Sequence, residues 1–153
     1  MTLAVRALKD QGAAFTIHEY GYEEHGGTTV AARELGADEH AVIKTLVFET
    51  DTRVPFLVLM HGDREVSAKN LARTLGVKTV TPSSPDTAQR HTGYQVGGIS
   101  PFGTRKKLPV HMERTLLDCP RVFINAGKRG LLAELTPAEI VRLLNPGLVD
   151  VAI

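Results

Sequence analysis

The chain has 153 residues, of which 42% are hydrophobic and 23% are charged. This length and composition predict one globular domain around one hydrophobic core, and they exclude the disordered and fibrous classes. The formal net charge is only +1, so attraction to a polyanion must come from a local group of cations. We therefore expect residues 1–153 to form a single domain.

Nothing in the sequence indicates a membrane span or a secretory signal. The apolar stretch 54–60 is far shorter than the roughly 20 residues that a membrane helix needs. Residues 1–12 lack an apolar run followed by a small-residue cleavage site. A cytoplasmic location is therefore expected. Cys119 is the only cysteine, and because no activating base adjoins it in the sequence, a half-buried structural role is favoured over a nucleophile.

Hydrophobic spacing and turn residues predict the elements of the amino-terminal half. They are a helix within residues 2–12, a strand over 15–20, a helix over 28–35, a short turn at 38–40, and strands over 42–49 and 55–60. The polar stretch ETDTRV joins the last two strands. This arrangement indicates an antiparallel hairpin.

The carboxy-terminal half continues with mixed elements. They are a helix over 67–75, a strand over 78–80, a helix over 85–91, strands over 108–112 and 121–125 around a short helix at 113–117, and a last helix ending at Leu144. The last helix has the clearest signal, since Thr136 can cap it, Pro137 suits its first turn and Glu139 completes a capping box. No repeat or linker interrupts this order, so an α+β domain is expected.

A lysine inside the first hairpin strand is the first candidate functional residue. Alternation places Lys44 on the same face as Leu46 and Phe48. A buried ammonium is costly unless it is paired or used, and solvation at a sheet edge is the alternative explanation. A lysine in a site can hold a carbonyl oxygen or a phosphate, or act as a base if burial lowers its pKa.

A glycine-rich run, HTGYQVGGISPFG at residues 91–103, is the second candidate. Adjacent glycines allow backbone N–H groups to approach an oxyanion or phosphate, although a structural turn explains the same residues. The turn NAGKRG at 125–130 and the cations at 105–107 offer positive charge to an anionic ligand, with solvated loops as the alternative. The phosphate-loop and dinucleotide fingerprints are absent.

Neither a metal site nor a protein nucleophile is indicated. The six histidines show no HxH, HxxxH or HExxH spacing, so we expect no metal and no other cofactor. Ser100 lies outside any G-x-S-x-G elbow, and no histidine partner for it is indicated. An enzyme built on this chain would therefore use no nucleophile of its own.

Together these motifs resemble the YbaK/ProX family of aminoacyl-tRNA deacylases, which are freestanding relatives of the editing domain in bacterial prolyl-tRNA synthetase. The resemblance is carried, in order, by VIKTLVF, AKNLARTLG, AQRHTGYQVGGISPFG, KKLPV and NAGKRGLLAELTPAEIVRLL. It implies a mixed β-sheet, barrel-like core wrapped by helices. It also implies hydrolysis of the ester that joins an amino acid to transfer RNA.

The resemblance assigns roles to individual residues. Lys44 is the implied functional lysine, and the implied substrate contacts are Tyr20, Thr45, Gly97, Gly98, Ile99, Ser100, Asn125 and Gly127. We expect transfer RNA itself to contact Arg105, Lys106, Lys107, Lys128 and Arg129. The implied partner is aminoacyl-tRNA, and delivery by prolyl-tRNA synthetase is left open. In the nearest branch, the Cys-tRNA(Pro) deacylases, the cysteinyl thiol attacks its own ester carbonyl.

The sequence departs from that branch at three places. Leu132 replaces an aspartate, Asn125-Ala126 replaces Ser-Gly, and His61-Gly62 replaces Val-Pro. These departures leave the aminoacyl group open, since alanyl-specific relatives share the scaffold. A tRNA- or synthetase-binding module without chemistry, and a small-molecule or nucleotide-binding protein, are the other hypotheses.

Overall fold

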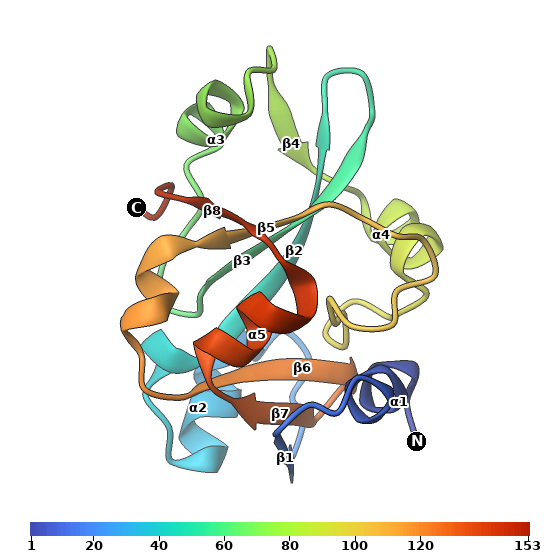
Figure 1. Cartoon of the computed structure of the whole chain (residues 1–153), viewed down its shortest axis with the longest axis vertical. Coiled ribbons are helices and arrows are strands. Elements are labelled where there is room, and N and C mark those ends of the chain that lie inside the picture. The colour runs from blue at the N-terminus through green and yellow to red at the C-terminus, as the bar shows by residue number, and fades with distance from the viewer.

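The computed structural model describes all 153 residues as two β-sheets with helices packed around them (Figure 1). The helices are α1 (Leu3–Asp10), α2 (Gly27–Leu35), η1 (Glu39–Ala41), α3 (Ala68–Leu75), α4 (Pro85–Thr92), η2 (Arg114–Asp118) and α5 (Pro137–Leu144), where η denotes a 3-10 helix. The strands are β1 (Thr16–Glu19), β2 (Ile43–Thr50), β3 (Pro55–His61), β4 (Val80–Pro82), β5 (Val110–Glu113), β6 (Val122–Lys128), β7 (Leu131–Leu135) and β8 (Gly147–Val149).

The larger sheet has the order β4-β2-β3-β5-β8, and the smaller sheet has the order β1-β7-β6. The expected hairpin is confirmed, because β2 and β3 pair antiparallel from Ile43↔His61 to Glu49↔Pro55. Strand β5 joins β3 in parallel, which makes the larger sheet mixed. One parallel bridge, Val42↔Phe123, links the two sheets. The α+β class is therefore confirmed, but the two sheets do not close into a barrel.

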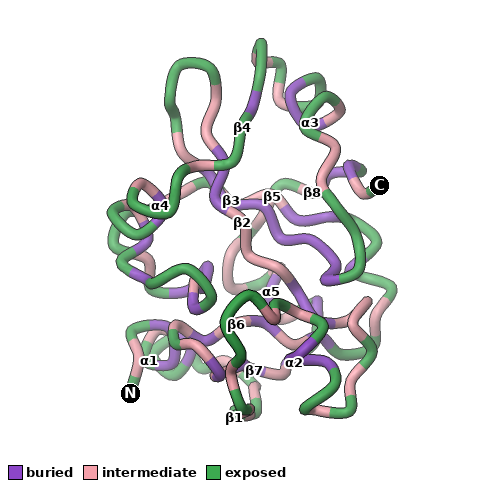
Figure 2. Tube along the Cα trace, turned by 180° about the vertical axis from the view of Figure 1, so that it is seen from behind, coloured by how far each residue is buried: buried purple, intermediate pink, exposed green.

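The main hydrophobic core is built from residues of both sheets together with α1 and α5. Its fully buried members include Ala4, Leu8, Leu59, Met112, Ile124, Leu135 and Ile140. Figure 2 shows that buried residues run along β3, whereas the tip of the β2–β3 hairpin is exposed. The core holds the strands in register, and it leaves most of the outer edge of β2 without a pairing strand. No helix of the chain combines the length and apolar character needed to cross a membrane.

Local capping explains why several helices begin where the sequence predicts. The Thr136 hydroxyl accepts a hydrogen bond from the Glu139 N–H at 3.2 Å, and Ser67 and Ser84 cap α3 and α4 in the same way. Two expectations shift: the strand expected at 78–80 lies at Val80–Pro82, and the helix expected at 113–117 is a 3-10 turn over Arg114–Asp118. Strands β7 and β8 were not predicted.

The Glu139 carboxylate also ties α5 to the segment before β1. It accepts hydrogen bonds from Arg142 Nε at 2.7 Å and from the backbone N–H of Ala14 at 2.8 Å. The bond from Arg142, and then that from Ala14, lower the pKa of Glu139 from 4.5 to about 2. Since both bonds favour the charged form, the contact depends on pH.

This contact predicts a specific acid sensitivity. A carboxyl group whose pKa is depressed by folding stabilises the fold above its unfolded value and loses that contribution as the pH falls through the folded value. For Glu139 that window runs from 4.5 down to about 2. Urea unfolding across this window should show a smaller loss of stability for Glu139→Gln than for the unmodified protein. Parallel profiles for the two proteins would contradict the assignment.

A buried chain of polar groups fixes the carboxy-terminal end of the protein. Glu113 Oε1 accepts hydrogen bonds from the N–H groups of Val151 and Ala152 at 2.8 Å and 3.1 Å. Its Oε2 accepts one from the Thr115 hydroxyl at 2.9 Å, and Thr115 also contacts His61 Nε2 at 2.7 Å. Glu113 and His61 are both buried. This chain therefore ties the last residues to η2 and β3.

Candidate active site

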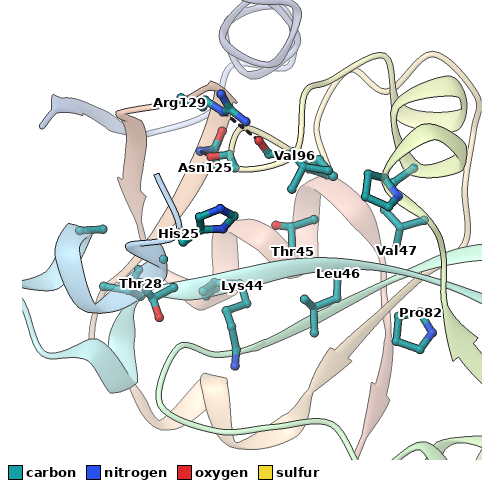
Figure 3. Close-up of a pocket in the computed structure, with 18 of the residues that line it drawn as sticks. His25, Thr28, Lys44, Thr45, Leu46, Val47, Pro82, Val96, Asn125 and Arg129 are labelled. Carbon is teal, nitrogen blue, oxygen red and sulfur yellow. Dashed lines mark hydrogen bonds between the residues drawn. The ribbon is translucent and has the colours of Figure 1, made fainter. Parts of the chain in front are cut away.

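A cavity of about 680 Å³ lies along the outer edge of β2 (Figure 3). Its wall comes from six segments: residues 20–31, strand β2, residues 65–68, residues 82–88, residues 96–99 and the turn between β6 and β7. Fourteen of its 27 lining residues are hydrophobic, so the cavity suits a ligand with a small apolar part and a few polar contacts.

The open edge of β2 forms the base of this cavity. Strand β4 pairs with β2 only at residues 48–50, and the bridge to β6 lies at Val42. Between these points no strand pairs with this edge of β2. Side chains alternate across a strand, and Figure 3 shows Thr45 and Val47 on one side of β2, with Lys44 and Leu46 on the other. The cavity therefore wraps around the strand edge.

Lys44 lies in the cavity wall with its charge only partly engaged. Its Nζ is 3.3 Å from Oε1 of Glu65, and the two side chains are 20% and 79% exposed. An ion pair with so exposed a partner is weak. Because this ion pair is weak, the ammonium remains available to a polar group that enters the cavity.

Two hydroxyl groups in the wall have no partner within the protein. Oγ1 of Thr45 and Oγ of Ser83 are both buried, and neither forms a hydrogen bond. Buried polar atoms nearly always have a partner, so such groups beside a cavity indicate where a ligand or water binds. Ser83 also donates its backbone N–H to the Val47 carbonyl at 2.9 Å, which places the two hydroxyl-bearing segments together.

The glycine-rich run and the GKRG turn form a continuous wall opposite β2. Asn125 Nδ2 donates to the Gly97 carbonyl at 3.1 Å, and Arg129 Nε donates to the Val96 carbonyl at 2.9 Å. Gly97 has a φ of +91°, and a Cβ there would lie 2.8 Å from the Tyr22 hydroxyl. Glycine is therefore required at this position for both backbone and packing reasons.

Arg129 also packs against an aromatic ring of the wall. Its guanidinium lies 5.0 Å from the centre of the Tyr22 ring, a distance typical of a cation–π contact. Tyr20 lines the same wall, and burial, followed by the charge of Tyr22, raises the pKa of its hydroxyl. Arg129 thus joins the glycine-rich run to Tyr22. Its contact with transfer RNA stays a prediction.

Three expected substrate contacts lie behind the cavity wall. Gly98 donates its N–H to the Gln95 carbonyl at 2.8 Å, so that N–H is not free for an oxyanion. Ser100 is fully buried, and its Oγ accepts from the Phe102 N–H at 3.2 Å. A Cβ at Gly127 would lie 2.8 Å from the Tyr94 ring. These residues pack behind the wall and shape it, and direct contact of any of them with substrate stays a prediction.

The remaining residues divide into two groups. Tyr20, Lys44, Thr45, Gly97, Ile99, Asn125 and Arg129 line the cavity together. The four other cations lie outside it and are exposed at the surface: Arg105, Lys106, Lys107 and Lys128. The structure thus brings the motifs of three distant segments to one cavity and leaves these four cations free for a larger ligand.

Several wall residues had no clear signal in the sequence. Tyr22, His25 and Thr28 come from the segment between β1 and α2, and Ser83 follows β4. Leu132, one of the departures noted in the sequence, also lines the cavity and is buried, so it adds apolar surface to the wall.

A separate group of potential metal ligands lies near η1. Ligand atoms of His40, His61 and Asp63 lie within 4.8 Å of one another. Sequence spacing does not reveal this group, because η1 and the end of β3 supply its members. Both ring nitrogens of His61 are already taken, Nδ1 by the His40 carbonyl at 2.6 Å and Nε2 by Thr115 at 2.7 Å. The group therefore functions as a hydrogen-bonded cluster in this conformation.

Solved structures place this fold among editing domains. A crystal structure described provisionally as a trans-editing enzyme for prolyl tRNA synthetase has a TM-score of 0.88 and 25% identity, covering 100% of this chain and 98% of its own. The hypothetical protein APE2540 has a TM-score of 0.90 and 22% identity, covering 99% of each chain. The second likeness shows the fold alone. The fold and its edge cavity thus define an editing-type domain.

Residues 23–143 match the family described as the aminoacyl-tRNA editing domain, and the chain belongs to this family. EbsC of Enterococcus faecalis, provisionally named a Cys-tRNA(Pro)/Cys-tRNA(Cys) deacylase, is 30% identical over 145 residues, which are 94% of this chain and 88% of EbsC. The proline–tRNA ligase of Levilactobacillus brevis is 27% identical over 95 residues, 62% of this chain but only 16% of the ligase. The implied resemblance is confirmed.

Proposed function

We propose that this protein hydrolyses the ester bond of mischarged aminoacyl-tRNA and that Cys-tRNA(Pro) is its main substrate. The observation that carries this proposal is the cavity along the open edge of β2, which is lined by Lys44, an unpaired Thr45 hydroxyl and the glycine-rich wall. The similarity to EbsC over 94% of the chain supports the choice of substrate.

The proposed chemistry uses a nucleophile from the substrate. Cys119, the only thiol, lies outside the cavity, and burial, together with nearby aspartates, raises its pKa. It is therefore unsuited to attack an ester. The thiol of the bound cysteinyl group instead attacks its own carbonyl carbon, and the bond to the ribose oxygen breaks. The protein supplies orientation and charge stabilisation.

Each wall segment has a role in this proposal. The ammonium of Lys44 stabilises the charge that develops on the carbonyl oxygen, and Thr45 Oγ1, on the other side of β2, hydrogen-bonds the amino group of the aminoacyl moiety. Gly97 and Ile99 form the surface against which the aminoacyl side chain packs. Asn125 and Arg129 hold that surface in place through their bonds to the Gly97 and Val96 carbonyls.

The body of transfer RNA contacts the exposed cations outside the cavity. With a net charge of only +1, binding depends on this local group, which consists of Arg105, Lys106, Lys107 and Lys128. Contacts to phosphates release counterions, so affinity should fall as salt increases. A prolyl-tRNA synthetase that has just released a mischarged product is the partner that would supply the substrate.

The test is a deacylation assay with a panel of charged transfer RNAs. The unmodified protein is incubated with Cys-tRNA(Pro), Ala-tRNA(Pro) and a Ser-charged transfer RNA, and the remaining ester is measured over time. We expect the fastest loss with Cys-tRNA(Pro), because only this substrate carries its own thiol. Faster loss of Ala-tRNA(Pro) would overturn the substrate assignment. Salt-sensitive binding without turnover of any substrate would replace the enzyme by a binding module.

A further inference from the structure

A histidine in the wall has no role in the scheme above. His25 lies between β1 and α2 and lines the cavity. Figure 3 shows its imidazole turned into the cavity, in this view between Asn125 and Lys44. The side chain therefore reaches the cavity between the GKRG turn and β2 in this view.

The backbone holds His25 in an uncommon conformation. Its φ is +60°, in the left-handed region that residues other than glycine seldom adopt. The next residue must be small, since a Cβ at Gly26 would lie 2.4 Å from Cγ2 of Val30. Uncommon backbone conformations of this kind concentrate at functional sites. This tight turn presents the imidazole to the cavity.

The segment carrying His25 is anchored at the start of α2. The Thr28 hydroxyl donates to Oε2 of Glu39 at 2.8 Å and approaches the Gly62 carbonyl at 3.2 Å. A Cβ at Gly62 would lie 2.7 Å from that hydroxyl, so glycine is needed there. The unusual His61-Gly62 pair thus supports the loop on which His25 is placed.

His25 is an exposed residue, and its ring is free to bond a substrate. Protein partners contact the rings of His18, His40 and His61, whereas no protein group hydrogen-bonds either nitrogen of His25. The other ionisable groups facing the cavity come from the same loop, β2, the segment before α3 and the GKRG turn: Tyr20, Tyr22, Glu24, Lys44, Glu65 and Arg129. Histidine is the side chain best suited to take and return a proton near neutral pH.

We propose that His25 is the catalytic residue that transfers the proton in this cavity, an inference that rests on the proposed deacylase function. The imidazole takes the proton from the cysteinyl thiol as the sulfur–carbon bond forms at the ester carbonyl. The carbon–oxygen bond to the ribose then breaks, and the imidazolium gives the same proton to the departing ribose oxygen. The products are transfer RNA with a free terminal hydroxyl and a cyclic thioester of cysteine, which water opens afterwards.

The experiment compares single-turnover deacylation of Cys-tRNA(Pro) by the unmodified protein, His25→Ala and His25→Asn. Loss of general acid–base catalysis typically lowers a rate by about 100-fold to 10,000-fold, and we expect a loss in this range for both variants. Asparagine also tolerates the left-handed conformation, so His25→Asn keeps the loop and removes only the proton transfer. His18→Ala, outside the cavity, is the matched control and should keep the full rate.

Two further readouts separate proton transfer from loop shape. The fall in rate toward acidic pH should disappear in both variants, and added imidazole should restore part of the rate of His25→Ala. Variant rates within about threefold of the unmodified protein would overturn the proposal, as would a slow His25→Asn that keeps the original pH profile while His25→Ala gains nothing from imidazole. In either case the deacylase function stands, whereas an inactive unmodified protein would overturn both proposals.

Discussion

Replacing Lys44 with alanine is expected to slow single-turnover deacylation of Cys-tRNA(Pro) by about 100-fold to 1,000-fold. This is the typical effect of removing one group that stabilises an oxyanion. Lys44 is largely covered, its only ion-pair partner is the exposed Glu65, and it faces the same cavity as the unpaired Thr45 hydroxyl. The variant should fold normally, because its charge is not part of the core.

Two controls make the Lys44 result specific. Lys69→Ala removes an exposed lysine of α3 that lies outside the cavity, and its rate should match that of the unmodified protein. Glu65→Gln removes the ion-pair partner of Lys44, and because exposed pairs contribute little, the rate should change by at most a few-fold. A Lys44→Ala protein with full activity would remove the lysine from the proposed mechanism while leaving the cavity as the site.

The largest expected effect on stability comes from Glu113. Replacing it with alanine leaves the N–H groups of Val151 and Ala152 without an acceptor and interrupts the chain to His61. Leaving one buried donor without a partner typically costs about 1–3 kcal/mol, and this substitution leaves more than one. Total stabilities of domains are about 5–15 kcal/mol, so the free energy of unfolding in urea should fall by a large fraction.

An exposed glutamate provides the control for the Glu113 experiment. Glu19 is an exposed residue of β1, and Glu19→Ala should change the free energy of unfolding by no more than about 0.5 kcal/mol. Glu113→Gln keeps an acceptor for one side of the network. Its loss in the free energy of unfolding should lie between those of Glu113→Ala and Glu19→Ala. A Glu113→Ala protein as stable as Glu19→Ala would show that the polar chain does not hold the carboxy-terminal end.

Elements with strong local signals could be predicted from sequence. The β2–β3 hairpin follows from two apolar runs and a polar connection, and α5 follows from Thr136, Pro137 and Glu139, whose capping bond the structure contains. Strand β8 has only three residues and exists through parallel pairing with β5. Such a strand depends on tertiary contacts and leaves no periodic pattern. Strand β7 is similarly short and follows directly on the turn at Gly130.

The same distinction explains what could be predicted of the site. Lys44, Gly97 and Asn125 belong to motifs that stand out along the chain, and the fold brings them to one cavity. Gly98 stood out equally, yet its N–H is bonded to Gln95, because adjacent glycines do not reveal which N–H groups are already taken. His25 and Ser83 reach the cavity through a left-handed turn and a strand pairing that only the folded chain defines.

The edge cavity gives a simple physical explanation of editing without a protein nucleophile. In the proposed mechanism an unpaired stretch of β2 supplies a cation and a hydroxyl, a glycine-rich wall held by Asn125 and Arg129 supplies shape, and the substrate supplies the attacking atom. The buried apolar side chain of Leu132 also lines the cavity.

The most direct test of this explanation is the single-turnover rate of ester loss from Cys-tRNA(Pro) with the unmodified protein in excess, measured beside the spontaneous rate in the same buffer. We predict a rate far above the spontaneous one, and a cysteine product formed together with intact transfer RNA. A rate equal to spontaneous hydrolysis would contradict the proposed function, because that function is the accelerated cleavage of this one bond.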